Sequence, residues 1–163
     1  MSPKYKNFTI YFLLSLILDQ GSKIWARHAL RPRHDAMVII PNFFDLRYAE
    51  NSGSAFSLLH DLANGRIVFL AFGVIALVVI AQWLKRLPAD SRVLAVAIGL
   101  ITGGALGNII DRALIGRVTD FIVWKVGIHQ WPTFNIADSL LVVGIGMILV
   151  HPSPKKSSST LRV

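Results

Sequence analysis

Residues 67–84 read IVFLAFGVIALVVIAQWL, and residues 93–110 read VLAVAIGLITGGALGNII; neither 18-residue stretch contains a charged side chain. At about 1.5 Å of rise per residue, a helix of this length crosses most of the hydrocarbon core of a bilayer. Residues 8–26 and 134–150 are nearly as apolar but carry polar side chains near one end. The sequence therefore predicts an all-α integral membrane protein with four transmembrane helices, over 8–26, 67–84, 93–110 and 134–150.

The composition agrees with a membrane protein. Hydrophobic residues make up 53% of the 163-residue chain, and the mean hydropathy of +0.55 is too high for an ordinary soluble domain. We expect one four-helix membrane domain over residues 1–163, with a disordered cytoplasmic tail at 151–163. The absence of cysteine excludes disulfides and a thiol nucleophile, and the five histidines lack metal-ligand spacing. We therefore expect no metal and no cofactor.

The net charge of +8 suggests nucleic acid binding in a soluble protein, but here it more plausibly reflects membrane topology. No nucleic-acid-binding motif accompanies the charge. Lys and Arg are densest in the terminal tails and in the turn at 85–92, which four spans place on one side. By the positive-inside rule, both termini are cytoplasmic, and segments 27–66 and 111–133 are extracytoplasmic.

The first extracytoplasmic segment contains recognisable local patterns. Residues 37–48 alternate apolar and polar side chains around Pro41-Asn42, which predicts two short β-strands joined by a turn. Residues 55–62 have the spacing of a short interfacial helix. Between them lies Asn51-Ser52-Gly53, a small polar run that in isolation favours a turn.

Polar residues gather at the extracytoplasmic ends of three predicted helices. They are Asp19, Lys23, Asn108, Asp111, Arg112, Asn135 and Asp138. Asp19 and Lys23 are four residues apart, Asn135 and Asp138 are three apart, and Asp111 and Arg112 follow Asn108 by three and four, so each set lies towards one helix face. A stripe of glycines at every fourth position, 99, 103 and 107, lets the third helix approach a neighbour closely. We expect the polar ends to form one cluster.

A charged side chain at the rim of a membrane helix is expensive and usually marks a functional site. Asp120 and Asp138 suggest acid–base chemistry, with one carboxyl protonated and the other charged. Simpler interpretations exist for single residues. Asp19 and Lys23 could form a structural salt bridge, with Lys23 extending to the interface, and Asp120 could be an N-cap or turn residue. We expect Asp111 and Arg112 to form a structural ion pair, with Arg112 also able to hold a ligand carbonyl.

Together these motifs resemble one family. The runs that carry the resemblance are DQGSK at 19–23, NSGSAFS at 51–57, GGALGNIIDR at 103–112, VTDF at 118–121 and FNIAD at 134–138. Their order and spacing resemble those of the lipoprotein signal peptidases (signal peptidase II), over nearly the whole chain except its termini. Two positions depart from the family pattern: Ser54, where Ala is common, and Thr119, where Val is usual.

The resemblance implies an aspartic endopeptidase of the bacterial inner membrane. Such enzymes remove the signal peptide from prolipoproteins, just before a cysteine that carries diacylglycerol. It implies Asp120 and Asp138 as the catalytic dyad. It also implies substrate-binding or dyad-supporting roles for Asp19, Lys23, Asn51, Gly53, Asn108, Asp111, Arg112 and Asn135. The implied partners are lipidated prolipoproteins, membrane lipid and cyclic peptide antibiotics that inhibit the family, and not nucleic acid.

Two other functions remain open from the residues alone. A small proton- or ion-coupled transporter also uses intramembrane Asp, Lys and Arg, but its polar residues would extend across the membrane midplane. A purely structural membrane subunit is the third possibility, and it leaves Asp138 without an explanation because no basic residue is adjacent to it.

Overall fold

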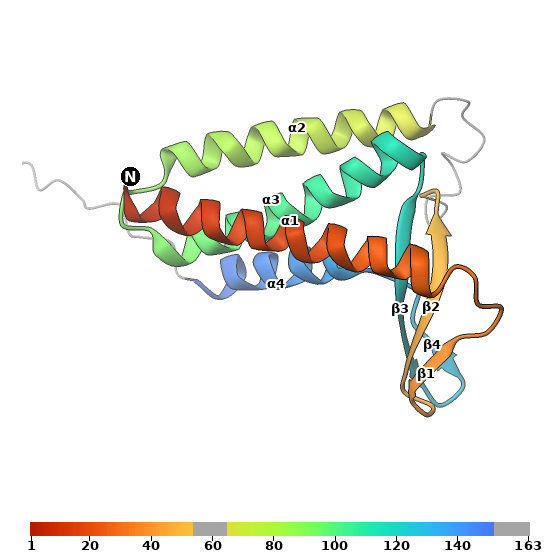
Figure 1. Ribbon diagram of the computed structural model, residues 1–163. Helices are drawn as coiled ribbons and strands as arrows, with labels where there is room; N and C mark the ends of the chain where they lie inside the picture. Colours follow the sequence, from red (N-terminus) through yellow and green to blue (C-terminus); the bar gives the residue numbers. More distant parts are fainter. Residues whose placement is uncertain (54–64, 152–163) are drawn as a thin grey trace, which may run out of the picture.

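The computed structural model describes residues 1–53 and 65–151 (Figure 1). This part of the chain forms four helices: α1 (Pro3–Ala29), α2 (Gly65–Arg86), α3 (Arg92–Ile115) and α4 (Ile136–Val150). Each predicted membrane segment is therefore helical. The first three helices extend beyond the predicted limits, whereas α4 begins two residues later than predicted. The predicted interfacial helix at 55–62 and the tail after His151 lie outside the described residues.

Among the described residues, α2 and α3 are long and apolar enough to cross a membrane. The helix α4 is apolar but has only 15 residues, and α1 has 27 residues with several charged ones inside it. The exposed surface of α2 includes large apolar side chains such as Ile67, Phe72 and Val79. An exposed apolar helix of this kind suits lipid better than water. The arrangement of four spans stays a prediction.

The helix α3 lies at the centre of the bundle, with α1 and α4 packed against it and α2 at one side (Figure 1). Glycines make this packing close. A Cβ atom on Gly99 would lie 2.9 Å from the Phe8 carbonyl oxygen of α1, and one on Gly104 would lie 2.6 Å from the Ala137 carbonyl oxygen of α4. The predicted close approach along the glycine stripe is confirmed.

A four-stranded antiparallel sheet, in the order β1-β2-β3-β4, lies at the end of the bundle opposite the N-terminus (Figure 1). Its strands are β1 (Met37–Ile40), β2 (Phe44–Asn51), β3 (Val118–Val126) and β4 (His129–Gln130). The predicted hairpin at 37–48 is confirmed, with Asn42 at φ 60° in its turn. The sequence missed β3 and β4. The interpretation of Asp120 as an N-cap or turn residue is wrong, because Asp120 lies inside β3.

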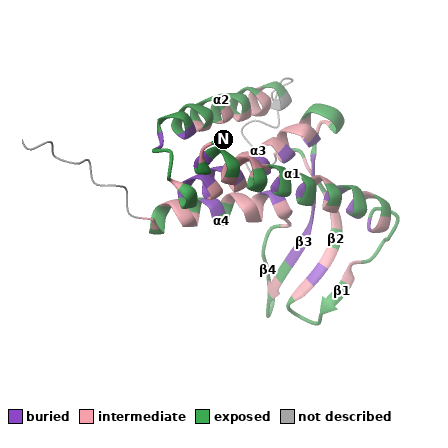
Figure 2. Cartoon of the chain, turned by 60° about the vertical axis from the view of Figure 1, so that its left-hand side comes forward, coloured by how far each residue is buried: buried purple, intermediate pink, exposed green. Residues whose placement is uncertain are grey.

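Burial explains why the sequence pattern did not predict β3. Residues 118–123 are all buried, so this strand lacks the alternation that marks a half-exposed strand (Figure 2). Phe121 and Ile122 pack with Ala26 and Leu30 at the end of α1. This apolar cluster packs the sheet against the helices and so positions Asp120 relative to α3 and α4.

Candidate active site

Asp120 is held between two amide side chains. The antiparallel register pairs Ala49 of β2 with Asp120, which brings Asn51 to the same region of the sheet. Asn51 Nδ2 donates to Asp120 Oδ2 at 2.9 Å, and Asn135 Nδ2 donates to Asp120 Oδ1 at 2.7 Å. Both carboxyl oxygens of this buried residue are therefore bound before any substrate arrives.

Asp138 occupies the first turn of α4, where it forms a capping box with Asn135. Asn135 Oδ1 accepts from the Asp138 backbone N–H at 3.1 Å, and Asp138 Oδ2 accepts from the Asn135 backbone N–H at 3.2 Å. Such reciprocal bonds satisfy the free N–H groups at a helix start and fix the side chain. The remaining oxygen, Oδ1, accepts from Asn108 Nδ2 at 2.9 Å.

Asn135 connects the two aspartates. Its Nδ2 donates to Asp120, and also to Asn108 Oδ1 at 3.2 Å, while its Oδ1 and backbone N–H bind Asp138. One fully buried amide thus contacts a carboxylate on β3 and a carboxylate on α4. The prediction that these polar residues form one cluster is confirmed.

A buried cation lies beneath this cluster. Lys23 Nζ donates to Asp19 Oδ2 at 2.9 Å and to Asn108 Oδ1 at 2.8 Å, and it lies 3.9 Å from Asp111 Oδ2. The predicted Asp19–Lys23 pair is confirmed. The simpler interpretation in which Lys23 extends to the interface is wrong, because its side chain is 0% exposed and lies beside two carboxylates.

Asp19 also links α1 to α4. Its Oδ1 accepts from the Ala137 backbone N–H at 3.0 Å, and Gln20 Nε2 donates both to Asp19 Oδ2 and to the Gly107 carbonyl. The Ala137 N–H is one of the free donors in the first turn of α4, next to Asp138. This bond therefore sets the depth at which α4 begins.

The predicted ion pair between Asp111 and Arg112 is wrong. Adjacent residues of a helix point in different directions, so their side chains do not face each other. Asp111 instead pairs with Arg27 of α1 at 3.2 Å and accepts the Thr119 backbone N–H at 2.9 Å. Arg112 lies over the Phe69 ring of α2 at 5.1 Å, and its Nη1 is 3.4 Å from the Asn108 carbonyl oxygen.

The turn predicted at residues 51–53 is confirmed. The Gly53 backbone N–H donates to Asn51 Oδ1 at 2.8 Å, so the Asn51 amide closes the turn with its oxygen while its nitrogen binds Asp120. Gly53 has φ +90°, and a Cβ atom there would overlap the Phe69 ring. Glycine is therefore needed at this position for both backbone conformation and space.

The two aspartates lie in different surroundings. Burial, with a smaller contribution from the nearby charge of Asp138, raises the pKa of Asp120 to about 6 against the opposing hydrogen bonds from Asn51 and Asn135. A carboxyl with this pKa is partly protonated near neutral pH and can donate a proton. Beside it, Asp138 is only half buried. Two carboxyls in unlike environments suit paired acid–base chemistry.

Sequence reasoning missed Gln20, Arg27 and Thr119 as parts of this network. Arg27 follows Lys23 by four residues and Asp19 by eight, so helical spacing alone places it on the same face of α1. Thr119 carried no such signal because the strand that contains it was not predicted. Within the described residues, no group of three His, Cys, Asp or Glu side chains is placed to hold a metal ion. That the site needs no metal stays a prediction.

An apolar groove of about 360 Å³ opens beside Asp138. Its lining includes Trp124 of β3, Trp131, Phe134, Val142 and Val143. The groove places apolar surface directly beside the Asp138 side chain.

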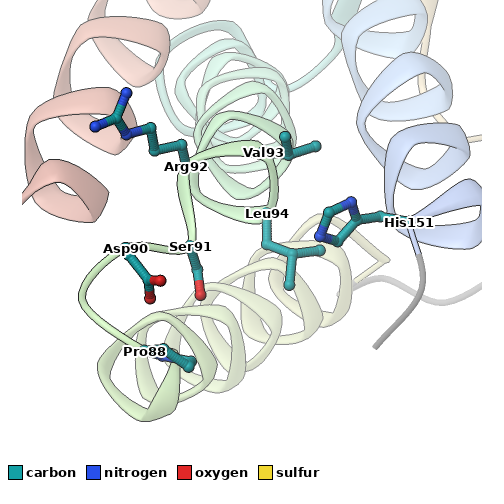
Figure 3. Close-up of a pocket in the computed structure, with 7 residues that line it drawn as sticks. All are labelled: Pro88, Asp90, Ser91, Arg92, Val93, Leu94 and His151. Carbon is teal, nitrogen blue, oxygen red and sulfur yellow. The ribbon is translucent and has the colours of Figure 1, made fainter. Parts of the chain in front are cut away.

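Another cavity, of about 300 Å³, lies where α2 joins α3 and α4 ends, between Pro88, Leu94 and His151 (Figure 3). It contains none of the predicted site residues.

Comparison with known proteins assigns this arrangement to a family. The sequence model of a family described as Signal peptidase (SPase) II matches residues 11–152. A lipoprotein signal peptidase of Geobacter metallireducens is 38% identical over 150 residues, covering 91% of each chain. One from Pseudomonas putida is 40% identical over 149 residues, covering 90% of this chain and 86% of that protein. A solved structure described as a bacterial membrane enzyme has a TM-score of 0.77 and 31% identity, covering 88% of this chain and 90% of the other.

The family model covers most of the helical frame, in the range that includes both Asp120 and Asp138. These matches do not support the transporter alternative. The chain belongs to the signal peptidase II family.

Proposed function

We propose that this protein is a lipoprotein signal peptidase that uses Asp120 and Asp138 as an aspartic dyad. It would hydrolyse the peptide bond between the signal peptide and the diacylglyceryl-cysteine of a prolipoprotein. The observation that carries the proposal is the shared Asn135, which holds a buried carboxyl on β3 and a second carboxyl at the start of α4. Family membership supplies the substrate class, because the relatives are named lipoprotein signal peptidases.

In the proposed reaction, a water molecule gives a proton to the Asp138 carboxylate while its oxygen bonds to the scissile carbonyl carbon. Asp120, whose raised pKa favours the protonated form, gives its proton to the carbonyl oxygen of the scissile peptide bond. The C–N bond then breaks as the proton held by Asp138 passes to the leaving nitrogen, and the proton on the former carbonyl oxygen returns to Asp120, which restores the dyad. The products are a signal peptide with a free carboxyl group and a lipoprotein with a free amine on its cysteine. No covalent intermediate is needed.

The supporting residues divide by what they contact. Asn51, Asn108 and Asn135 donate to the two carboxyls and hold them in place. Arg112 has no carboxylate within salt-bridge distance among the described residues. Its guanidinium is thus available for a substrate carbonyl or for the developing oxyanion. Gly53, which has no side chain, lets the Asn51 turn lie close to the Phe69 ring beside the site.

The groove beside Asp138 supports a lipid-bearing substrate. Its lining by Trp124, Trp131, Phe134 and two valines would accept an acyl chain or the apolar signal segment. We place the sheet end of the bundle at the extracytoplasmic face of a bacterial inner membrane, with both termini in the cytoplasm. A substrate anchored by two acyl chains would then present its scissile bond near the depth of the dyad. Cyclic peptide antibiotics would compete for the same site.

The test uses purified protein in nanodiscs with two forms of one prolipoprotein, with and without diacylglycerol on the cysteine. We expect release of the signal peptide from the modified form at a much higher initial rate. Equal rates on both forms would remove lipid recognition from the proposal, and no cleavage of either form would overturn the peptidase assignment. Proton flux into protein-loaded liposomes would instead favour the transporter.

A further inference from the structure

Three side chains form a closed ring directly beneath the strand that carries Asp120. Arg27 Nη1 donates to Thr119 Oγ1 at 2.8 Å and lies 3.2 Å from Asp111 Oδ1. The other oxygen of Asp111 accepts the Thr119 backbone N–H at 2.9 Å. We call this ring of Arg27, Asp111 and Thr119 the strand clamp. It joins the end of α1, the last turns of α3 and the start of β3.

The strand clamp binds Thr119 twice, once through the backbone and once through the hydroxyl. Thr119 is 0% exposed and Asp111 is 2% exposed, so the backbone bond is made away from water, whereas the hydroxyl bond is to Arg27, whose side chain is 23% exposed. Bonds that involve a charged group are stronger than neutral ones, especially in such surroundings. Thr119, the residue immediately before Asp120, is therefore bound to the helices through its own N–H and hydroxyl, and not only to the neighbouring strand.

Side chains alternate along a strand, so Thr119 and Asp120 point to opposite faces of β3. Thr119 faces the clamp, while Asp120 faces the amides of Asn51 and Asn135. A small rotation or shift of β3 at Thr119 would move the Asp120 carboxyl relative to Asp138.

Valine resembles threonine in shape but has no hydroxyl, so a valine at this position would leave Arg27 Nη1 with Asp111 alone. We propose that Thr119 is a positioning residue for the dyad, whose hydroxyl, held by Arg27, fixes the part of β3 that carries Asp120. This inference rests on the proposed function, since its consequence is read in the cleavage rate.

The test compares Thr119→Val, which keeps the shape and removes the hydroxyl, with Thr119→Ser, which keeps the hydroxyl. Thr102→Val is the matched control, because it also removes a hydroxyl that makes one hydrogen bond, to the Ile98 carbonyl of α3, but it lies outside the clamp. Misplacing a reacting group by a fraction of an ångström lowers the rate of the chemical step. We expect Thr119→Val to lower kcat about tenfold with KM unchanged, and the other two variants to remain near the wild type.

A second comparison isolates the contact with Arg27. Arg27→Gln should also lower kcat, and adding Thr119→Val to it should cause little further loss, because the bond is already absent. Fully additive losses would overturn the inference. So would a wild-type kcat for Thr119→Val, or equal losses for Thr119→Val and Thr119→Ser.

The two proposals fail in different ways. If the wild-type protein cleaves the lipidated substrate and Thr119→Val cleaves it equally well, the positioning role alone is wrong. If the wild-type protein cleaves no prolipoprotein, the proposed function is wrong and the positioning role falls with it. Hydrogen exchange across residues 118–123 shows in either case whether the clamp holds β3, since Thr119→Val should speed exchange there.

Discussion

Replacing Lys23 by methionine removes the buried cation that the carboxylates beneath the site require. Lys23 is 0% exposed, and its Nζ lies 2.9 Å from Asp19 Oδ2 and 3.9 Å from Asp111 Oδ2. Methionine fills a similar volume without the charge. Asp111 keeps Arg27 at 3.2 Å, so Asp19 is the carboxylate that loses its cation.

The expected cost follows from this geometry. Removing one partner of a buried ion pair typically costs about 3–5 kcal/mol, because the other charge remains buried without compensation. We therefore expect Lys23→Met to lower the free energy of unfolding by about 3–5 kcal/mol. Adding Asp19→Asn should recover part of this loss, because the amide removes the uncompensated charge.

The assay is denaturant-driven unfolding in bicelles, with the free energy compared between variants. Arg117→Met is the matched control, since Arg117 pairs with Glu50 on the surface and is 58% exposed. Exposed pairs contribute about 0–1 kcal/mol. A loss below about 1 kcal/mol for Lys23→Met, equal to that of the control, would refute the role given to the buried cation.

Three further predictions concern pH, packing and topology. The pKa of Asp120 is raised to about 6, so the protonated form of this carboxyl is lost as the pH rises through that value. We therefore expect kcat/KM to fall as the pH rises past about 6. A flat profile of kcat/KM from pH 5 to 8 would argue against Asp120 as the proton donor. Gly104→Ala should lower the free energy of unfolding by about 1–3 kcal/mol in the same assay, because the added Cβ would lie 2.6 Å from a carbonyl oxygen of α4. Gly146→Ala is the control and should cause no loss, because a Cβ there would have open space around it. Equal losses for the two variants would contradict the close packing of α3 against α4. Reporter fusions should be cytoplasmic at Ala89 and exported at Gln130, and the opposite result would invert the topology.

The sequence predicted the elements whose pattern is local. Apolar runs, two of them free of charged residues, located all four helices, and alternation around Pro41-Asn42 located the first hairpin. The strand β3 has no such pattern, because both of its faces are covered and its apolar run resembles a buried helix segment as closely as a strand. Its place in the sheet depends on β2, which is distant in the chain.

In the candidate site too, contacts within one element were predicted and contacts between elements were not. Helical spacing correctly paired Asp19 with Lys23 and brought the polar residues to one end of the bundle. Spacing could not identify partners across elements, so Asp111 was assigned to its neighbour Arg112, whereas it binds Arg27 and Thr119. The central place of Asn135 depends on where α4 meets β3, and no pattern within one element contains that information.

The most direct test of the dyad is the cleavage rate of three asparagine variants on the lipidated prolipoprotein. Asp120→Asn and Asp138→Asn keep nearly the shape of the side chain but cannot exchange a proton, so each should lose at least about 100-fold in kcat while remaining folded. Asp45→Asn is the matched control, because Asp45 is also buried but pairs with Lys125 away from the site. We predict near wild-type cleavage for this control. Near wild-type cleavage by Asp120→Asn or by Asp138→Asn would contradict the account.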